Sequence, residues 1–331
     1  MERRVGHLTG GGRAADGGGL NSNGLVVGDS HHSPLEITDL DGDDDRIAAQ
    51  VAGSFGKQLN SHGFGFQHGV MRRAQDLKDG GRSGWVCEAV EVPVRVAGED
   101  TRIDLVLQRH PGTPFYMLAE CKRANPSLSN WCFARAPFVH RGRRAANEPV
   151  MLERVTARPH GQGIKSAVFP RNMAAESKVC HIALDVRSNE KGEQHDSGRG
   201  AIEKAASQIM RGLNGFVDLL ATHQAIMKGH PLVIIPVIFT TARLWLSHVD
   251  LSESDLRSGE VDLKNSAFES VPWVCYQYHL SPGIKHSYWA GNAPDDIPSL
   301  LDLDFIRSIF VVGPDGMEDF FYRTSFWDID V

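Results

Sequence analysis

Two short apolar segments of the chain carry charged residues at positions where an ordinary core strand does not need them. Asp104 lies within residues 102–107, and Glu120 and Lys122 end the run 115–122. Carboxylates can hold a hard cation that activates water, and a neighbouring ammonium can stabilise negative charge on a phosphoryl group. These residue types therefore indicate a site suited to metal-assisted hydrolysis.

The two segments also have the pattern of a β-hairpin. Both are β-rich, and residues 109–114 between them have the Pro and Gly content of a hairpin loop. Glu120 and Lys122 share one strand face, while Cys121 points to the other. If the pairing sets Asp104 opposite Glu120, two like charges meet across the ladder, which destabilises a sheet. A divalent cation between them would turn that cost into a binding site.

This combination resembles the PD-(D/E)xK nuclease superfamily, which includes many restriction endonucleases and DNA-repair nucleases. The resemblance rests on Asp104, the triplet Glu120-Cys121-Lys122 and a later helix carrying Gln208, and it covers roughly residues 45–250. It implies an αβββαβ core in which the acid and the E-x-K triplet lie on adjacent strands and bind magnesium.

The chain departs from the family pattern at two places. Ile103 stands where the motif has proline, as is frequent in divergent members. The helix expected before the hairpin, about residues 46–59, has no glutamate where many members carry one.

The resemblance also implies a role for each residue of the site. Asp104 and Glu120 would be the Mg²⁺ ligands, with Mn²⁺ as a substitute and the Cys121 backbone carbonyl as a further ligand. Lys122 would position the attacking water or stabilise the developing negative charge, and Gln208 would orient water or phosphate. The Cys121 thiol should be buried and uninvolved. Glu88 or Glu91 could add a third carboxylate; the alternative is that they pair with surface arginines or face water.

The predicted fold is α/β (α+β) with a mixed sheet, namely a restriction-endonuclease-like αβββαβ core with a large insertion and a C-terminal extension. Residues 1–44 include ten glycines and few large apolar side chains, which predicts a disordered tail. The core would span residues 45–250, with a basic insertion at about 123–195. Residues 251–331 would form a β-rich extension packed on the core.

Hydrophobic periodicity predicts the individual elements. A helix at 46–59 would carry an apolar stripe at Ile47, Val51, Phe55 and Leu59. Glycines between 63 and 69 are expected to break the pattern before a short basic helix. The other predicted elements are helices at 71–77 and 201–228, and strands at 85–96, 179–186, 231–239, 273–280 and 305–312.

The stretch after the hairpin is strongly basic. Residues 122–178 hold 11 Lys and Arg against three acids, a local net charge of +8. Such a segment is either a solvated surface or a phosphate-facing insertion. Its aromatic residues would either stack on exposed bases or pack onto the core. The candidate nucleic-acid contacts are Lys204, Arg211, Arg141, Arg143 and Arg144; the three aromatic residues are Trp131, Phe133 and Phe138.

Composition restricts the remaining options. The net charge is −6, so the chain as a whole does not bind nucleic acid by bulk charge alone. The five cysteines are scattered without CxxC spacing, which predicts reduced thiols in the cytoplasm. No apolar run is long enough to span a membrane, so no membrane partner is expected.

The sequence therefore predicts a metal-dependent endonuclease acting on DNA, in genome defence or mobile-element biology. A two-fold homodimer is an open option, because such dimers often cut both strands of a duplex. The alternative is a catalytically inactive module that binds nucleic acid or a protein partner on a nuclease scaffold, which the missing helix glutamate and the overall acidity favour. A third option is an interaction protein that contacts no nucleic acid.

Overall fold

The computed structural model describes most of the chain. The described residues are 41–96, 98–109, 115–126, 129–135, 152–157, 163–168, 179–186, 200–222, 232–263, 266–279 and 306–325. The chain divides into two units, residues 1–53 and residues 54–331. All the strands described here belong to the second unit.

Helix α1 (Asp41–His62) crosses the boundary between the two units. It confirms the predicted helix at 46–59 and extends it at both ends. The predicted apolar stripe is largely solvent-exposed, because Ile47, Val51 and Phe55 are each more than half exposed. The predicted disordered tail lies outside the described residues up to residue 40, whereas residues 41–44 are helical.

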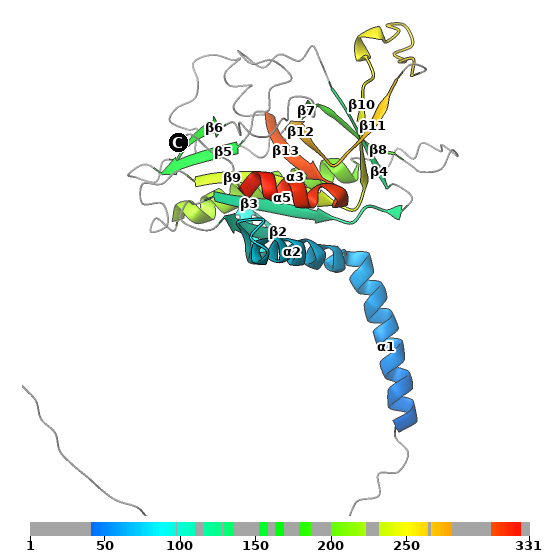
Figure 1. The fold of residues 1–331 in the computed structure, drawn as a ribbon, viewed down its shortest axis with the longest axis vertical. Helices are drawn as coiled ribbons and strands as arrows, with labels where there is room; N and C mark the ends of the chain where they lie inside the picture. The colour runs from blue at the N-terminus through cyan, green and yellow to red at the C-terminus, as the bar shows by residue number, and fades with distance from the viewer. Residues whose placement is uncertain are drawn as a thin grey trace, which may run out of the picture. The chain divides into compact units, whose positions relative to one another are not determined.

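The main sheet runs in the order β1-β2-β3-β9-β13-β12-β7 (Figure 1). Its strands are β1 (Trp85–Val96), β2 (Glu99–Arg109), β3 (Phe115–Lys122), β9 (Leu232–Thr240), β13 (Ile306–Val312), β12 (Trp273–His279) and β7 (Val179–Cys180). The first three strands form an antiparallel meander, and β9 then lies parallel to both β3 and β13. Strands β5 (Leu152–Ala157) and β6 (Gly163–Val168) join this sheet where β5 pairs with β9. The predicted mixed α/β class is therefore confirmed.

A second sheet has the order β11-β10-β4-β8. It consists of β11 (Phe268–Val271), β10 (Arg243–Ser247), β4 (Asn130–Ala134) and β8 (Ile182–Val186). The prediction of one strand at 179–186 is wrong, because the chain leaves the main sheet after Cys180 and enters the second sheet at Ile182. Alternation along the sequence cannot show this change of partner.

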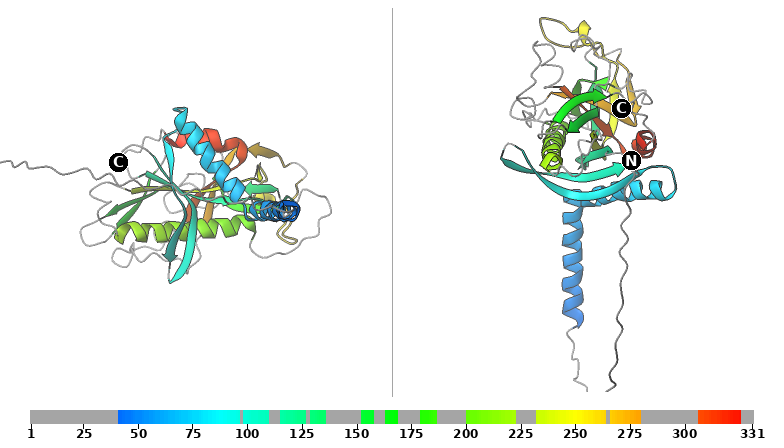
Figure 2. Two further views of the ribbon diagram at one scale, coloured as in Figure 1. Left: turned by 90° about the horizontal axis from the view of Figure 1, so that it is seen from below. Right: turned by 90° about the vertical axis from the view of Figure 1, so that its left-hand side faces the viewer.

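In the described part of the chain, three helices cover the main sheet: α2 (Phe64–Asp79), α3 (Ala201–Thr222) and α5 (Met317–Ser325). Figure 2 shows α3 on one face of the sheet and α2 and α5 on the other. One buried cluster joins α3 to the strands, and a second joins α2 and α5 to them. Short 3-10 helices occupy Leu251–Glu253 and Pro314–Gly316.

Helix α2 corrects the helix predicted at 71–77. It starts directly after Gly63, which has a φ of 77°, and runs through Gly65 and Gly69, the residues expected to break it. Burial decides the outcome, because Gln67, Val70, Ala74 and Leu77 recur at helical spacing and all lie against the sheet. Tertiary packing of this face outweighs the low helix propensity of two glycines.

Two aromatic residues of the basic stretch belong to the core. Trp131 and Phe133 on β4 are fully buried and lie in the same cluster as α3. Packing onto the core, and not stacking on bases, is therefore their role, while Phe138 lies outside the described residues. The C-terminal residues also do more than pack on the core, because β12 and β13 are hydrogen-bonded strands of the main sheet.

Helix α3 approaches the β1–β2 hairpin closely at two glycines. A Cβ atom at Gly212 would lie 2.8 Å from Ile103 Cγ1, and one at Gly215 would lie 2.7 Å from Val94 Cβ. Glycine lowers helix propensity, so these positions are explained by the contact with the strands.

We predict that Gly215→Ala destabilises the protein by about 1–3 kcal/mol, because the added methyl overpacks a contact between helix and strand. The matched control is Gly69→Ala on α2, where a Cβ would have no neighbour within 4 Å. That substitution should stabilise the protein by up to about 1 kcal/mol through helix propensity. Urea denaturation measures both values, and shifts of the same sign in the two variants would contradict the close approach of α3.

Candidate active site

The strand registers bring three carboxylates into one row across the main sheet. Leu105 pairs with Ala119, so the same register continued by one residue sets Asp104 opposite Glu120. On the other side of β2, Val90 pairs with Leu105 and Val92 with Ile103. That register places Glu91 of β1 opposite Asp104. Asp104 on β2 therefore has an acidic residue opposite it on each neighbouring strand.

Asp104 is fixed by the backbone of the next strand. Its Oδ2 accepts a hydrogen bond from the Cys121 backbone N–H at 2.7 Å. Burial raises the pKa of Asp104, while the Cys121 hydrogen bond and the charge of Lys122 lower it and the charge of Glu91 raises it. The carboxylate is thus partly desolvated and firmly oriented toward β3.

Glu120 is almost entirely buried, with 1% of its surface exposed. Its Oε1 lies 2.5 Å from Lys122 Nζ, and its Oε2 has no hydrogen-bond partner among the described residues. Burial is the main cause that raises the pKa of Glu120 to about 8, and the charges of Asp104 and Glu91 add to it against the opposing effect of Lys122. An unpaired carboxylate oxygen in the interior costs several kcal/mol, so this position needs an explanation.

Lys122 lies between Glu120 and helix α3. Besides the contact with Glu120, its Nζ donates a hydrogen bond to Gln208 Oε1 at 3.2 Å. The four side chains predicted to form the site, from β2, β3 and α3, therefore meet at one end of β3. Cys121, predicted to be uninvolved, packs with its side chain against the cluster on the other face of the sheet.

Helix α2 contributes a residue to the site that the sequence analysis missed. Gln67 Nε2 donates one hydrogen bond to Glu91 Oε1 at 3.1 Å and another to the Asp104 backbone oxygen at 2.9 Å. The sequence indicates Gln67 only if residues 64–79 are recognised as a helix, because Gln67 is then a polar residue at a core position. Gly65 and Gly69 argue against a helix there. Of the two acids considered for a third carboxylate, Glu91 lies at the site and Glu88 is exposed.

The donor set suits a hard cation held by few protein ligands. Asp104 and Glu120 lie opposite each other on β2 and β3, and Glu120 Oε2 is a buried oxygen with an unused acceptor site. Within the described ranges, no group of three or more His, Cys, Asp and Glu side chains is placed to hold a metal ion directly. Mg²⁺ keeps several waters and accepts one or two carboxylates, so these residues fit magnesium better than a metal that needs a full protein cage.

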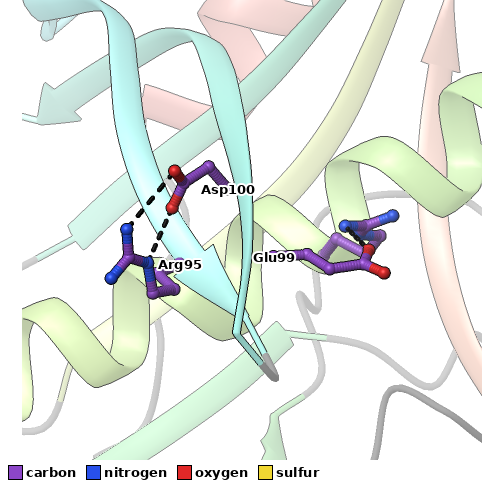
Figure 3. A network of polar contacts seen from close by, with 4 residues as sticks. Arg95, Glu99 and Asp100 are labelled. Atoms are coloured by element: carbon purple, nitrogen blue, oxygen red, sulfur yellow. Dashed lines mark hydrogen bonds and ion pairs between the residues drawn. The ribbon is translucent and has the colours of Figure 1, made fainter.

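The structure describes two of the five predicted nucleic-acid contacts, Lys204 and Arg211. Lys204 is exposed on α3, whereas Arg211 forms an ion pair with Glu99 at 2.5 Å. Glu99 and the neighbouring pair Arg95–Asp100 lie at the turn of the β1–β2 hairpin (Figure 3). Arg211 is half-buried in this pair and Glu99 is exposed. The predicted contacts Arg141, Arg143 and Arg144 lie outside the described residues.

A cavity of about 650 Å³ lies beside the hairpin and α3. Arg95, Arg102 and Leu219 are among its lining residues, but Asp104, Glu120 and Lys122 are not. The cavity is therefore separate from the carboxylate row. Arg102 borders both, because its guanidinium also lies 3.9 Å from Glu91 Oε2.

Comparison with known proteins gives no relative, since no family model, curated protein or solved structure matches the chain. Within the part of the chain that the structure describes, no helix combines the length and apolarity needed to cross a membrane.

The raised pKa of Glu120 predicts a pH-dependent stability. Since the folded protein keeps a proton that the unfolded chain releases above about pH 4.5, Glu120 makes the free energy of unfolding fall as the pH rises toward 8. We expect Glu120→Gln to be more stable than the wild type by about 2–4 kcal/mol at pH 9, with little difference at pH 4. Denaturation at both pH values in EDTA measures the difference, and a gap that does not change with pH would contradict the buried ionisation.

Proposed function

We propose that this protein is a metal-dependent nuclease that hydrolyses phosphodiester bonds in DNA. The observation that carries the proposal is the arrangement at the end of β3: buried Glu120, with an unpaired oxygen, lies opposite Asp104 and beside Lys122. Two hard anionic ligands and an adjacent ammonium are the groups that such a hydrolysis requires.

Each side chain has a definite task in the proposed reaction. A bound Mg²⁺ would supply an activated water and Lewis-acid stabilisation of the phosphoryl oxygens. Asp104, held by the Cys121 N–H, and Glu120 would bind it, with the Cys121 carbonyl as a further oxygen ligand. Lys122 would leave Glu120 to stabilise negative charge on the phosphate or to position water. Gln208 would keep the Lys122 ammonium near β3 during this exchange.

The order of elements supports a restriction-endonuclease-like core. Helix α2, the meander β1-β2-β3, helix α3 and the buried strand β9 follow one another as αβββαβ, with β4 to β8 inserted before α3. The helix that precedes the meander is α2, and not the predicted helix at 46–59. In the core we propose, Gln67 on that helix, which bonds Glu91 and the Asp104 backbone oxygen, would stand in for the glutamate of the family pattern.

The alternative function is a binding module on a scaffold that does not cleave. The contact between Lys122 and Glu120 favours it, because an internal ammonium already neutralises the acid that a cation would need. The net charge of −6 favours it as well, since duplex DNA must then be held by local basic groups.

We predict Mg²⁺- or Mn²⁺-dependent cleavage of plasmid DNA by the wild type. Asp104→Asn should lose at least about 100-fold in rate because the site loses an anionic ligand, and Lys122→Met should lose a similar factor because charge stabilisation is removed. Gel analysis of plasmid cleavage over time measures both effects.

The matched controls carry the same changes away from the site. Asp100→Asn, also on β2, and Lys78→Met, at the end of α2, alter exposed residues and should cleave like the wild type. Undiminished cleavage by both site variants would remove these residues from the mechanism. A wild type that binds DNA but does not cut it with either metal would select the binding module, and absence of binding at low salt would argue against both functions.

A further inference from the structure

Glu91 is held in a backbone conformation that is unfavourable for its residue type. Its φ is 50°, and no other described residue except glycine has a positive φ. The left-handed region costs free energy for any residue with a Cβ atom, and a long acidic side chain has no local advantage there. Such strain persists only where the surroundings impose it, and it is concentrated at functional sites.

Gln67 is the group that holds the Glu91 side chain. Its side chain is buried, and its amide donates both N–H groups, one to Glu91 Oε1 and one to the Asp104 backbone oxygen. The amide nitrogen of Gln67 therefore links the Glu91 carboxylate on β1 to the backbone of Asp104, a proposed metal ligand on β2. Any movement of Glu91 away from the row would break this partly buried hydrogen bond.

Electrostatics give no structural reason for an acid at this position. The charge of Glu91 makes ionisation of both Asp104 and Glu120 more difficult. The nearest basic group, Arg102, is 3.9 Å away and its side chain is 69% exposed, so it compensates little. The positive φ of Glu91 and its charge beside two other acids are therefore two unfavourable contributions, which the contacts with Gln67 and Arg102 must offset.

We propose that Glu91, held by Gln67, is the third carboxylate of the cation site and accepts hydrogen bonds from water bound to the cation. This inference rests on the proposed function. Direct ligation by three acids is not supported, because the described residues hold no such group. A hydrated Mg²⁺ presents several water molecules, however, and a carboxylate one layer further out can orient them. The buried, unpaired Glu120 Oε2 is an independent observation that points to a ligand position here.

Mn²⁺ binding to the full-length protein, without DNA, tests the proposal directly. Electron paramagnetic resonance of free Mn²⁺ gives the affinity, and water proton relaxation gives the number of waters on the bound ion. We expect Glu91→Gln to bind Mn²⁺ about tenfold more weakly, as is typical when an outer-shell partner is lost. The number of waters on the ion should not change, because Glu91 is not a direct ligand. The matched control Glu88→Gln, on the exposed part of the same strand, should bind like the wild type.

Glu91→Gly provides a second readout that a purely structural residue would not give. Glycine relieves the positive φ and removes the charge, and it also removes the hydrogen bond from Gln67, whose nitrogen keeps its bond to the Asp104 backbone oxygen. We therefore expect a melting temperature no lower than that of the wild type together with weaker Mn²⁺ binding. A lower melting temperature would assign Glu91 to the structure and overturn the proposal.

The remaining outcomes separate this inference from the proposed function. A wild type that binds no Mn²⁺ would remove the cation site itself. A wild type that binds Mn²⁺ with unchanged affinity in Glu91→Gln would leave the nuclease proposal standing and overturn the role of Glu91. If the Mn²⁺ bound to the Glu91→Gln variant carried one more water than in the wild type, Glu91 would be a direct ligand. That result would overturn the proposal that Glu91 contacts the ion only through water.

Discussion

The buried carboxylate of Glu120 is the constraint on which the surrounding structure depends. Moving a carboxylate out of water costs several kcal/mol, and the residue opposite Glu120 on the neighbouring strand β2 is another acid, Asp104. The fold compensates only in part, through the contact between Lys122 and one of the two oxygens. The other oxygen has no partner among the described residues. The main sheet therefore contains a local electrostatic cost that the packing of both its faces must offset.

That packing also gives the site its geometry. Helix α3 lies close to the hairpin because Gly212 and Gly215 allow Ile103 and Val94 to approach its backbone. The close approach brings Gln208 within hydrogen-bonding distance of Lys122. On the opposite face, α2 buries Val70, Ala74 and Leu77, and the same burial holds Gln67 against the main chain of β2. The two buried clusters thus set the positions of polar groups from two helices around the ends of the strands.

Sequence reasoning predicts the parts of this structure that local pattern determines. Alternation and turn chemistry give the meander β1–β3, and the hairpin register then places Asp104 opposite Glu120. The parts that depend on distant partners could not be read in this way. Val179–Val186 alternates like one strand, yet its two halves pair with strands from different sheets. Gln67 was missed because Gly65 and Gly69 suggest a break, and only burial against the sheet shows that the helix continues.

The charges of the site bear on the kind of cation that it could take. Glu91, Asp104 and Glu120 together carry three negative charges when all are ionised, and Lys122 is the cation in direct contact with Glu120. The Arg102 guanidinium near Glu91 is largely exposed, so it is left out of this count of interior charge. The interior balance is then two negative charges, which one divalent ion would neutralise and one monovalent ion would not. A second divalent ion would leave an excess of positive charge in a partly buried place. The arrangement therefore favours a single divalent cation. In the reaction we propose, a substrate phosphate would bring the negative charge that Lys122 meets after leaving Glu120.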